Sequence, residues 1–158
     1  MILYTTSEKY LPSFKINHLD NNSIANLAEI DSFELPTAHF RKMEHNIIWI
    51  RYKIRKDEFT VEDAMAHSDA VSTLNGGKPA HLIIDFRESE ISFSTEAREY
   101  FAKNPDHSKL RKSQALILKG LAQKIVANFY LKFHRPNCPV QYFTDAGSAF
   151  KWILNLGT

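Results

Sequence analysis

The stretch Ala80–Ala102, AHLIIDFRESEISFSTEAREYFA, decides how the rest of the chain is interpreted. It begins with the apolar run Leu82 to Ile84, which is typical of a strand buried on both faces. A polar turn follows, and then Ser94 and Thr95 precede a run of good helix formers. The stretch therefore predicts a buried strand, an exposed turn and a capped helix. Open α/β folds usually place their binding sites at junctions of this kind.

The segment before this stretch predicts a hairpin and a helix. The β-rich runs His39–Met43 and Ile47–Ile54 are joined by a short polar linker, which indicates two antiparallel strands. Thr60 and Asp63 stand three residues apart at the start of an apolar helical pattern, an arrangement that resembles a capping box. Two glycines after residue 75 then end this helix.

The segment after it alternates strands and helices. In chain order it predicts a helix over Thr95–Lys103, a helical turn over Asp106–Lys112, a strand over Ser113–Leu118, a helix over Leu121–His134, a strand over Val140–Phe143 and a helix over Ala146–Leu156 that Asp145 caps. The main order is ββαβαβαβα, in which apolar strands alternate with helices. This order predicts an α/β fold, with a mostly parallel sheet, an N-terminal antiparallel hairpin and about four flanking helices.

Residues 1–36 are weakly patterned. We expect them to form an N-terminal extension, partly docked on a single domain over residues 37–158. Within the extension, Ser23 is placed to cap a short helix over Ile24–Ile30. Two roles for the extension stay open: packing against the domain, or an arm that covers a pocket or reaches a neighbouring subunit.

Composition narrows the class of protein. The chain has 158 residues and a net charge of +2, with basic residues scattered among acidic ones, so we do not expect a nucleic-acid partner. The single Cys138 has no partner for an internal disulfide, which favours a cytoplasmic location. The N-terminus lacks the features of a signal peptide, and no apolar run reaches the ~18 residues that a membrane span needs.

No motif in the chain specifies a reaction. None of the seven histidines pairs at metal-ligand spacing, and Cys138 lies in no nucleophile signature, so we expect neither a metal nor another cofactor. His67 falls at helical spacing with Ala64 and Leu74. The charged residues that follow the central strand, Asp85, Arg87 and Glu88, either bind an ion or form a solvated salt-bridge patch.

The predicted helix over Leu121–His134 is unusually apolar. Leu121, Ala122, Ile125, Phe129 and Phe133 form one stripe, which we expect to face the sheet. Apolar surface continues around the helix, chiefly through Val126, Phe129, Tyr130 and Leu131. So wide a stripe exceeds what one sheet face buries. Neighbouring helices or the N-terminal arm cover the excess, or it lines a hydrophobic pocket or a subunit interface.

The order of elements and several local motifs resemble the STAS domain, the fold of SpoIIAA-type anti-sigma factor antagonists and of sulfate-transporter tails. More narrowly, the chain is similar to SpoIIAA-like, STAS/SEC14-related bacterial proteins of unknown function. The resemblance covers about Ala38 to Leu156. The residues that carry it are Ile84-Asp85-Phe86-Arg87, Glu96 to Tyr100, Ala122 to Lys132, Pro136, Pro139, Tyr142 to Asp145, Ala149 and Trp152.

Regulatory members of this family carry an Asp-Ser-Ser-Gly-type turn whose serine is phosphorylated by a partner kinase. The corresponding stretch here is Phe93 to Ala97, in which Ser94 and Thr95 provide hydroxyls but the Asp and Gly are missing. Ser94 and Thr95 are therefore candidate phosphoacceptors. A plain capping role for these hydroxyls is the competing interpretation, and we favour it.

Three functions follow from these patterns. The favoured one is a non-catalytic, regulatory module that binds another protein, or a second copy of itself, through a surface made by Asp85, Arg87, Glu88, Ser94, Thr95 and Arg98. The alternative is a binder of an apolar or lipid-like small molecule beside the 121–134 helix. An enzyme is the least favoured, and it would require Asp85, Arg87, Lys119 and a histidine to meet in one site.

Overall fold

The computed structural model describes residues 27–55, 57–133 and 136–156 and shows one six-stranded sheet in the order β1-β2-β3-β4-β5-β6. The strands are β1 Glu29–Glu34, β2 Ala38–Met43, β3 Ile47–Tyr52, β4 Ala80–Asp85, β5 Arg111–Ile117 and β6 Val140–Phe143. The first three strands pair antiparallel, and β3 to β6 pair in parallel. The predicted α/β class and mixed sheet are therefore confirmed.

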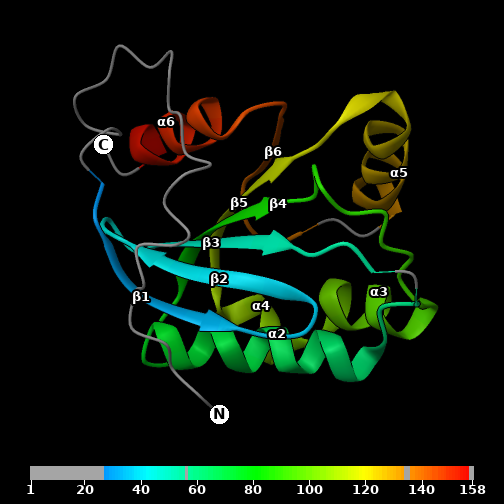
Figure 1. Cartoon of the computed structure of the whole chain (residues 1–158), viewed down its shortest axis with the longest axis horizontal. Helices are drawn as coiled ribbons and strands as arrows, with labels where there is room; N and C mark the ends of the chain where they lie inside the picture. The colour runs from blue at the N-terminus through cyan, green and yellow to red at the C-terminus, as the bar shows by residue number, and fades with distance from the viewer. Residues whose placement is uncertain (1–26, 56, 134–135, 157–158) are drawn as a thin grey trace.

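Within the described residues, five helices flank the sheet: α2 Val61–Leu74, α3 Thr95–Lys103, α4 Pro105–Lys109, α5 Gly120–Phe133 and α6 Ala146–Leu156. Figure 1 shows α6 on one face of the sheet and α2, α3 and α4 on the other, while α5 stands apart from α2 at one edge of the molecule. The molecule thus has three layers, as doubly covered parallel sheets require.

Several predicted boundaries agree with the structure, because local capping decides them. The Oγ1 of Thr60 accepts from the backbone N–H of Asp63 at 3.3 Å, and Oδ2 of Asp63 accepts from the N–H of Thr60 at 2.9 Å. Ser94 caps α3 by accepting from the N–H of Ala97 at 3.0 Å. Asp145 likewise caps α6 through the N–H of Ser148 at 2.7 Å. Helices α3 and α6 begin where these signals predicted.

The N-terminal edge of the sheet corrects one prediction. The short helix expected over Ile24–Ile30 is wrong from Glu29 on, because β1 pairs there along β2. Phe33 of β1 is buried and meets Phe40 of β2 edge-on, with ring centroids 6.4 Å apart. Pairing with the next strand in a hairpin outweighs a weak local helical pattern. Ser23, its predicted cap, lies outside the described residues.

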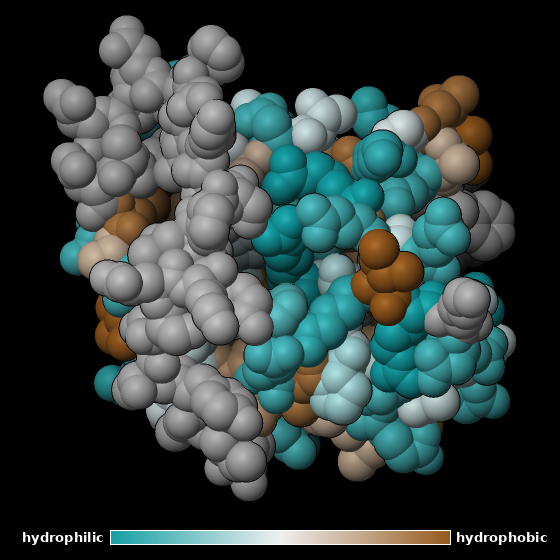
Figure 2. Space-filling view, viewed as in Figure 1, coloured by the Kyte–Doolittle hydropathy of each residue, from teal (hydrophilic) through white to brown (hydrophobic). Residues whose placement is uncertain are grey.

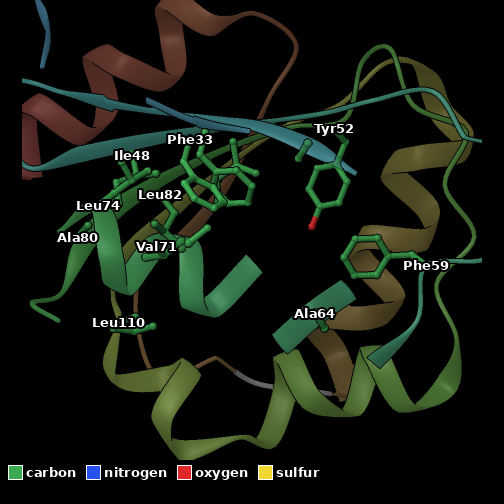
Figure 3. Packing of buried hydrophobic residues seen from close by; sticks show 14 of the residues in the cluster. Phe33, Ile48, Tyr52, Phe59, Ala64, Val71, Leu74, Ala80, Leu82 and Leu110 are labelled. Carbon is green, nitrogen blue, oxygen red and sulfur yellow. The ribbon is translucent and has the colours of Figure 1, made fainter. Parts of the chain in front are cut away.

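Each face of the sheet carries its own hydrophobic cluster, because residues two apart on a strand share a face. On the face covered by α2, Ile48 and Leu82 pack with the helix residues Val71 and Leu74 (Figure 3). Trp49 and its neighbours in β4 and β5 point to the opposite face, where α6 covers them. The same alternation of strand side chains between the two faces also determines which of them can line a cavity on the α2 face.

Candidate functional site

The polar turn after β4 is held together by its own charges. Asp85 is buried, and it accepts from the guanidinium of Arg87 twice, at 3.0 Å from Nε and 2.8 Å from Nη2. The backbone N–H of Arg87 donates to the same carboxylate at 3.1 Å. This bidentate pairing raises the pKa of the Arg87 guanidinium above its ordinary value. The pair thus fixes the turn, and the Asp85 side chain is not part of the exposed surface.

The six residues expected to form one contact surface make hydrogen bonds within two groups. Glu88 is exposed and pairs with Arg51 of β3 at 2.7 Å, next in sequence to the Asp85–Arg87 pair. On α3, Thr95 is exposed and accepts from Nη2 of Arg98 at 3.1 Å. The Ser94 hydroxyl oxygen accepts from the N–H of Ala97 in the α3 cap. One group thus lies at the end of β4 and the other at the start of α3.

A cavity of about 340 Å³ lies on the face of the sheet that α2 covers. Its floor consists of alternate residues of the parallel strands, Ile50, Leu82, Ile84 and Leu116. The walls come from α2, the β4–α3 turn and α3, through Val71, Phe93, Phe101 and Ala102, and α5 adds Ala122 and Ala127. Apolar residues supply most of the lining. Two-residue periodicity in β3, β4 and β5 places apolar side chains on the floor, and the small residues of α5 leave space above them.

Two buried histidines bring polarity into this cavity. Nε2 of His67 lies at hydrogen-bond distance, 2.7 Å, from Oγ1 of Thr37, and Nδ1 of His107 lies 2.7 Å from Oγ of Ser68. Burial lowers the pKa of both imidazoles to about 3, so both are neutral at physiological pH. Each ring therefore offers hydrogen-bonding capacity without charge, as an apolar occupant with a single polar group would need.

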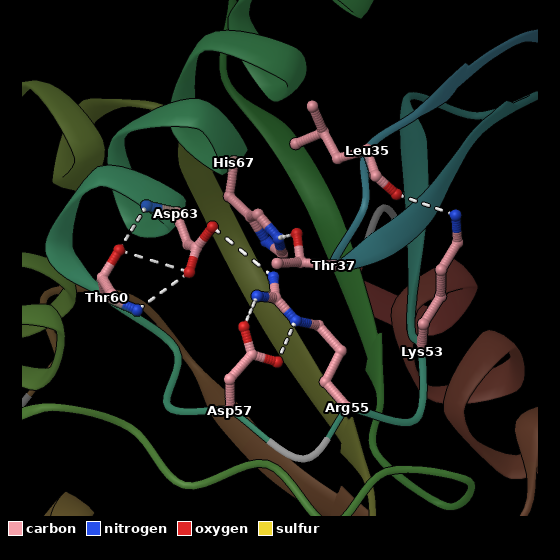
Figure 4. A network of polar contacts seen from close by, with 8 residues as sticks. All are labelled: Leu35, Thr37, Lys53, Arg55, Asp57, Thr60, Asp63 and His67. Atoms are coloured by element: carbon pink, nitrogen blue, oxygen red, sulfur yellow. Dashed lines mark hydrogen bonds and ion pairs between the residues drawn. The ribbon is translucent and has the colours of Figure 1, made fainter.

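The position of His67 is fixed on all sides. Its ring lies 4.8 Å from that of Phe40 and 4.9 Å from that of Phe59, measured between centroids. Figure 4 shows its bond to Thr37 beside a second network, in which Arg55 pairs with Asp57 and lies 3.7 Å from Asp63 at the start of α2. These contacts tie the β3–α2 connection to the helix that carries His67.

Charged and polar residues also line the cavity. Arg111 is buried and donates from Nη2 to Oγ of Ser108 at 3.0 Å, while Glu90 on the β4–α3 segment and Arg98 on α3 are exposed. Gln123 ties α5 to the turn by donating to the carbonyls of Phe86, at 3.2 Å, and Ser89, at 3.3 Å. The sequence offered two signals for this site: His67 at helical spacing with apolar residues of α2, and the apolar 121–134 helix, from which Ala122, Gln123 and Ala127 line the cavity. His107 and Arg111 carried no such signal, because only the tertiary fold brings α4 and β5 to the cavity.

Helix α5 corrects a second expectation. The Leu121 and Ile125 side chains are 72% and 58% exposed, so the stripe expected to face the sheet points away from it at these positions. Of the same stripe, Ala122 lines the cavity, and Ala127 from outside the stripe lines it too. Gln123 sets this rotation by anchoring the first turn of α5. The side chains of Val126, Phe129, Tyr130 and Leu131, expected to form the pocket or interface, lie outside the described residues.

The residues considered for an enzyme do not converge. Arg87 encloses Asp85 at the strand end, whereas His67 and His107 line the cavity on the face that α2 covers. Among the described residues, no group of three His, Cys, Asp or Glu side chains could hold a metal ion. Within the same ranges, no helix is long and apolar enough to cross a membrane.

The sheet order and the covering helices define a SpoIIAA-like α/β protein. A crystal structure of an uncharacterized DUF3478-family protein with a SpoIIAA-like fold, from Shewanella loihica PV-4, is similar with a TM-score of 0.54. The two chains are 18% identical, and the similarity covers 73% of this chain and 91% of that one. It confirms the fold expected from the sequence motifs.

The chain belongs to the family of DUF7793, a domain of unknown function, whose profile matches residues 41–156. No curated protein matches the chain. Family membership therefore agrees with the expected class, a SpoIIAA-like protein of unknown function, and the cavity is the feature from which a function is argued below.

Proposed function

We propose that the protein binds an apolar small molecule in the cavity between the sheet, α2, α3 and α5. The observation that carries this proposal is the cavity itself, about 340 Å³ in volume and lined mainly by apolar side chains. Ligand sites in proteins are usually apolar cavities of about 300–1,000 Å³ with a few polar groups that fix orientation. The neutral imidazoles of His67 and His107 are such groups here.

Packing energetics supports an occupant. The atoms that line an unfilled cavity lack dispersion contacts on one side, and an apolar guest restores these contacts. The floor residues Leu82, Ile84 and Leu116 come from central strands, so the site stands on a rigid part of the fold. Gln123 of α5 donates to the carbonyl of Ser89 in the β4–α3 turn. A guest that contacts the α5 wall is therefore linked through this hydrogen bond to the exposed turn.

A non-catalytic, regulatory role through protein contact is our second proposal. It is supported by the exposed residues Glu88 and Glu90 on the β4–α3 segment and Arg98 on the first turn of α3, at or next to the cavity lining. In this proposal a partner protein, or a second copy of the chain, contacts the segment Arg87–Thr95. We place both functions in a bacterial cytoplasm, because the single Cys138 suits a reducing compartment.

Neighbouring positions on α3 allow a matched test of the cavity. Ala102 lines the cavity and Lys103 is exposed beside it. The probe is the fluorescent dye 1-anilinonaphthalene-8-sulfonate, titrated into the folded protein at neutral pH. We expect Ala102→Phe to weaken dye binding at least about tenfold, because the added ring projects into the cavity and takes space that the dye's own rings need. We expect Lys103→Phe to leave it unchanged.

The control for folding is the thermal unfolding transition, which both variants must retain. Equal dye affinity in the wild type and in Ala102→Phe would show that the dye binds elsewhere and would contradict the proposal. A wild-type protein that binds no dye while folded would contradict it as well.

A further inference from the structure

Helix α5 exposes two large apolar side chains on one side. Leu121 and Ile125 are 72% and 58% exposed and stand four residues apart, so they are neighbours on the helix surface. In the described ranges, the other large apolar side chains that are exposed come from separate elements: Ile30, Ile54, Met65 and Leu156. Figure 2 shows hydrophobic surface over α5 at one corner of the molecule. The exposed apolar pair is therefore a local property of α5.

The same segment carries a concentrated positive charge. Residues 119–135 contain four Lys and Arg and no Asp or Glu, whereas the whole chain has a net charge of only +2. The rest of the chain is therefore net negative. Lys119 is exposed and Lys124 is half-buried at the N-terminal part of α5, close to the apolar pair in sequence. A surface that combines exposed apolar residues with lysines is typical of helices that lie in a membrane interface.

We propose that α5 docks the protein onto an anionic membrane surface, with Leu121 and Ile125 entering the boundary between headgroups and acyl chains. The lysines then lie at headgroup level, where each contributes attraction to anionic lipid. A membrane can hold both the apolar pair and the lysines, because its apolar layer lies directly beneath negatively charged headgroups. We therefore favour a lipid surface over an acidic protein or a second copy of the chain.

Among the described residues, the contacts that hold α5 in place do not use Leu121 or Ile125. Ala122 and Ala127 face the cavity, and Gln123 anchors the first turn to the β4–α3 segment, so the helix keeps one rotation. Leu121 and Ile125 do not line the cavity. Membrane docking is therefore separable from binding of a guest, and variants at these two positions test it alone.

The test is co-sedimentation of the full chain with vesicles of phosphatidylcholine that contain about one-third phosphatidylglycerol. We expect Leu121→Ser with Ile125→Ser to weaken vesicle binding at least about tenfold, since two apolar side chains no longer enter the interface. The matched control is Ile54→Ser with Met65→Ser, which removes two exposed apolar residues elsewhere and should leave binding unchanged.

Charge-reversal variants provide a second test of membrane docking. We expect Lys124→Glu to weaken binding at least about fivefold, while Lys151→Glu on α6 serves as the control and changes it less. Binding should also fall with added salt and should be weak on pure phosphatidylcholine.

Wild-type protein that ignores anionic vesicles would overturn the proposal, as would equal losses in the α5 variants and their controls. Sedimentation velocity compares the oligomeric state of the wild type with that of the Leu121 and Ile125 variant. If the wild type is a dimer, the variant is a monomer and vesicle binding is unchanged, the apolar pair contacts a second copy of the chain and the proposal is wrong. Dye binding in the cavity is the independent readout, and it should persist in every α5 variant.

Discussion

Helices α5 and α6 follow neighbouring parallel strands, yet they close opposite faces of the sheet in different ways. On α6, Phe150 and Ile153 are buried, and Phe150 meets Trp49 of β3 edge-on with centroids 5.2 Å apart. On α5, Ala122 and Ala127 line the cavity. Small residues on a helix leave space that large ones would fill, so the face under α6 is filled, whereas the face under α2 combines a core with a cavity beside α5.

The largest expected effect tests the filled face. Phe150→Ala should lower the free energy of unfolding by about 3–5 kcal/mol, because it removes a buried ring from a closely packed cluster. Chemical denaturation measures this loss. The comparison variant is Leu116→Ala on the cavity floor, where the space already present should reduce the cost. A larger loss for Leu116→Ala than for Phe150→Ala would break the comparison.

Acid should destabilise the cavity face specifically. The folded pKa of His67 and of His107 is lowered to about 3, below the ordinary value of 6.5, so the unfolded chain binds protons that the folded chain does not. Stability from these groups is therefore fully present above pH 6.5 and falls as the pH drops toward 3. Between pH 6.5 and pH 5 each histidine should cost about 2 kcal/mol.

Denaturation curves across this pH range measure the slope. We expect His67→Gln and His107→Gln each to flatten it, whereas His45→Gln, at an exposed position in the β2–β3 turn, should leave it as in the wild type. An unchanged slope in both cavity variants would show that these imidazoles are not buried neutral groups.

A pair of matched alanines gives the smallest but sharpest effect. Ala149 of α6 is fully buried in the filled cluster, so Ala149→Leu should overpack it and cost about 1–3 kcal/mol. Ala127 of α5 borders the cavity, so Ala127→Leu should be neutral or stabilise the fold by about 0.5–2 kcal/mol. Equal destabilisation by both substitutions would mean that the α5 side is packed as tightly as the α6 side.

Local signals made much of the fold predictable. The capping residues Thr60, Ser94 and Asp145 mark helix starts that the structure confirms, and two-residue alternation marks the strands. β1 was not predicted, because the apolar spacing before residue 31 favoured a helix, whereas residues 29–34 pair with β2 in a hairpin. The rotation of α5 depends on Gln123 reaching carbonyls of the β4–α3 turn, a contact between residues more than thirty positions apart.

Within the candidate site, some residues could be predicted from local sequence and others could not. Asp85 and Arg87 were recognisable as a charged pair at a strand end, but their burial and mutual pairing emerge only from the structure. The helical spacing of α2 placed His67 on the inner side of its helix. His107 and Arg111 line the cavity because the fold brings α4 and β5 to it. Residues that act through tertiary proximity leave no spacing pattern in one sequence.

An apolar guest in the cavity would be carried through gentle purification. Native mass spectrometry of the full chain detects it, with Ala102→Phe as the comparison. We expect a species heavier than the bare chain, which releases a small apolar molecule on organic extraction and is lost or reduced in the variant. Bare chain alone in the wild type, or an adduct of equal abundance in Ala102→Phe, would contradict this expectation.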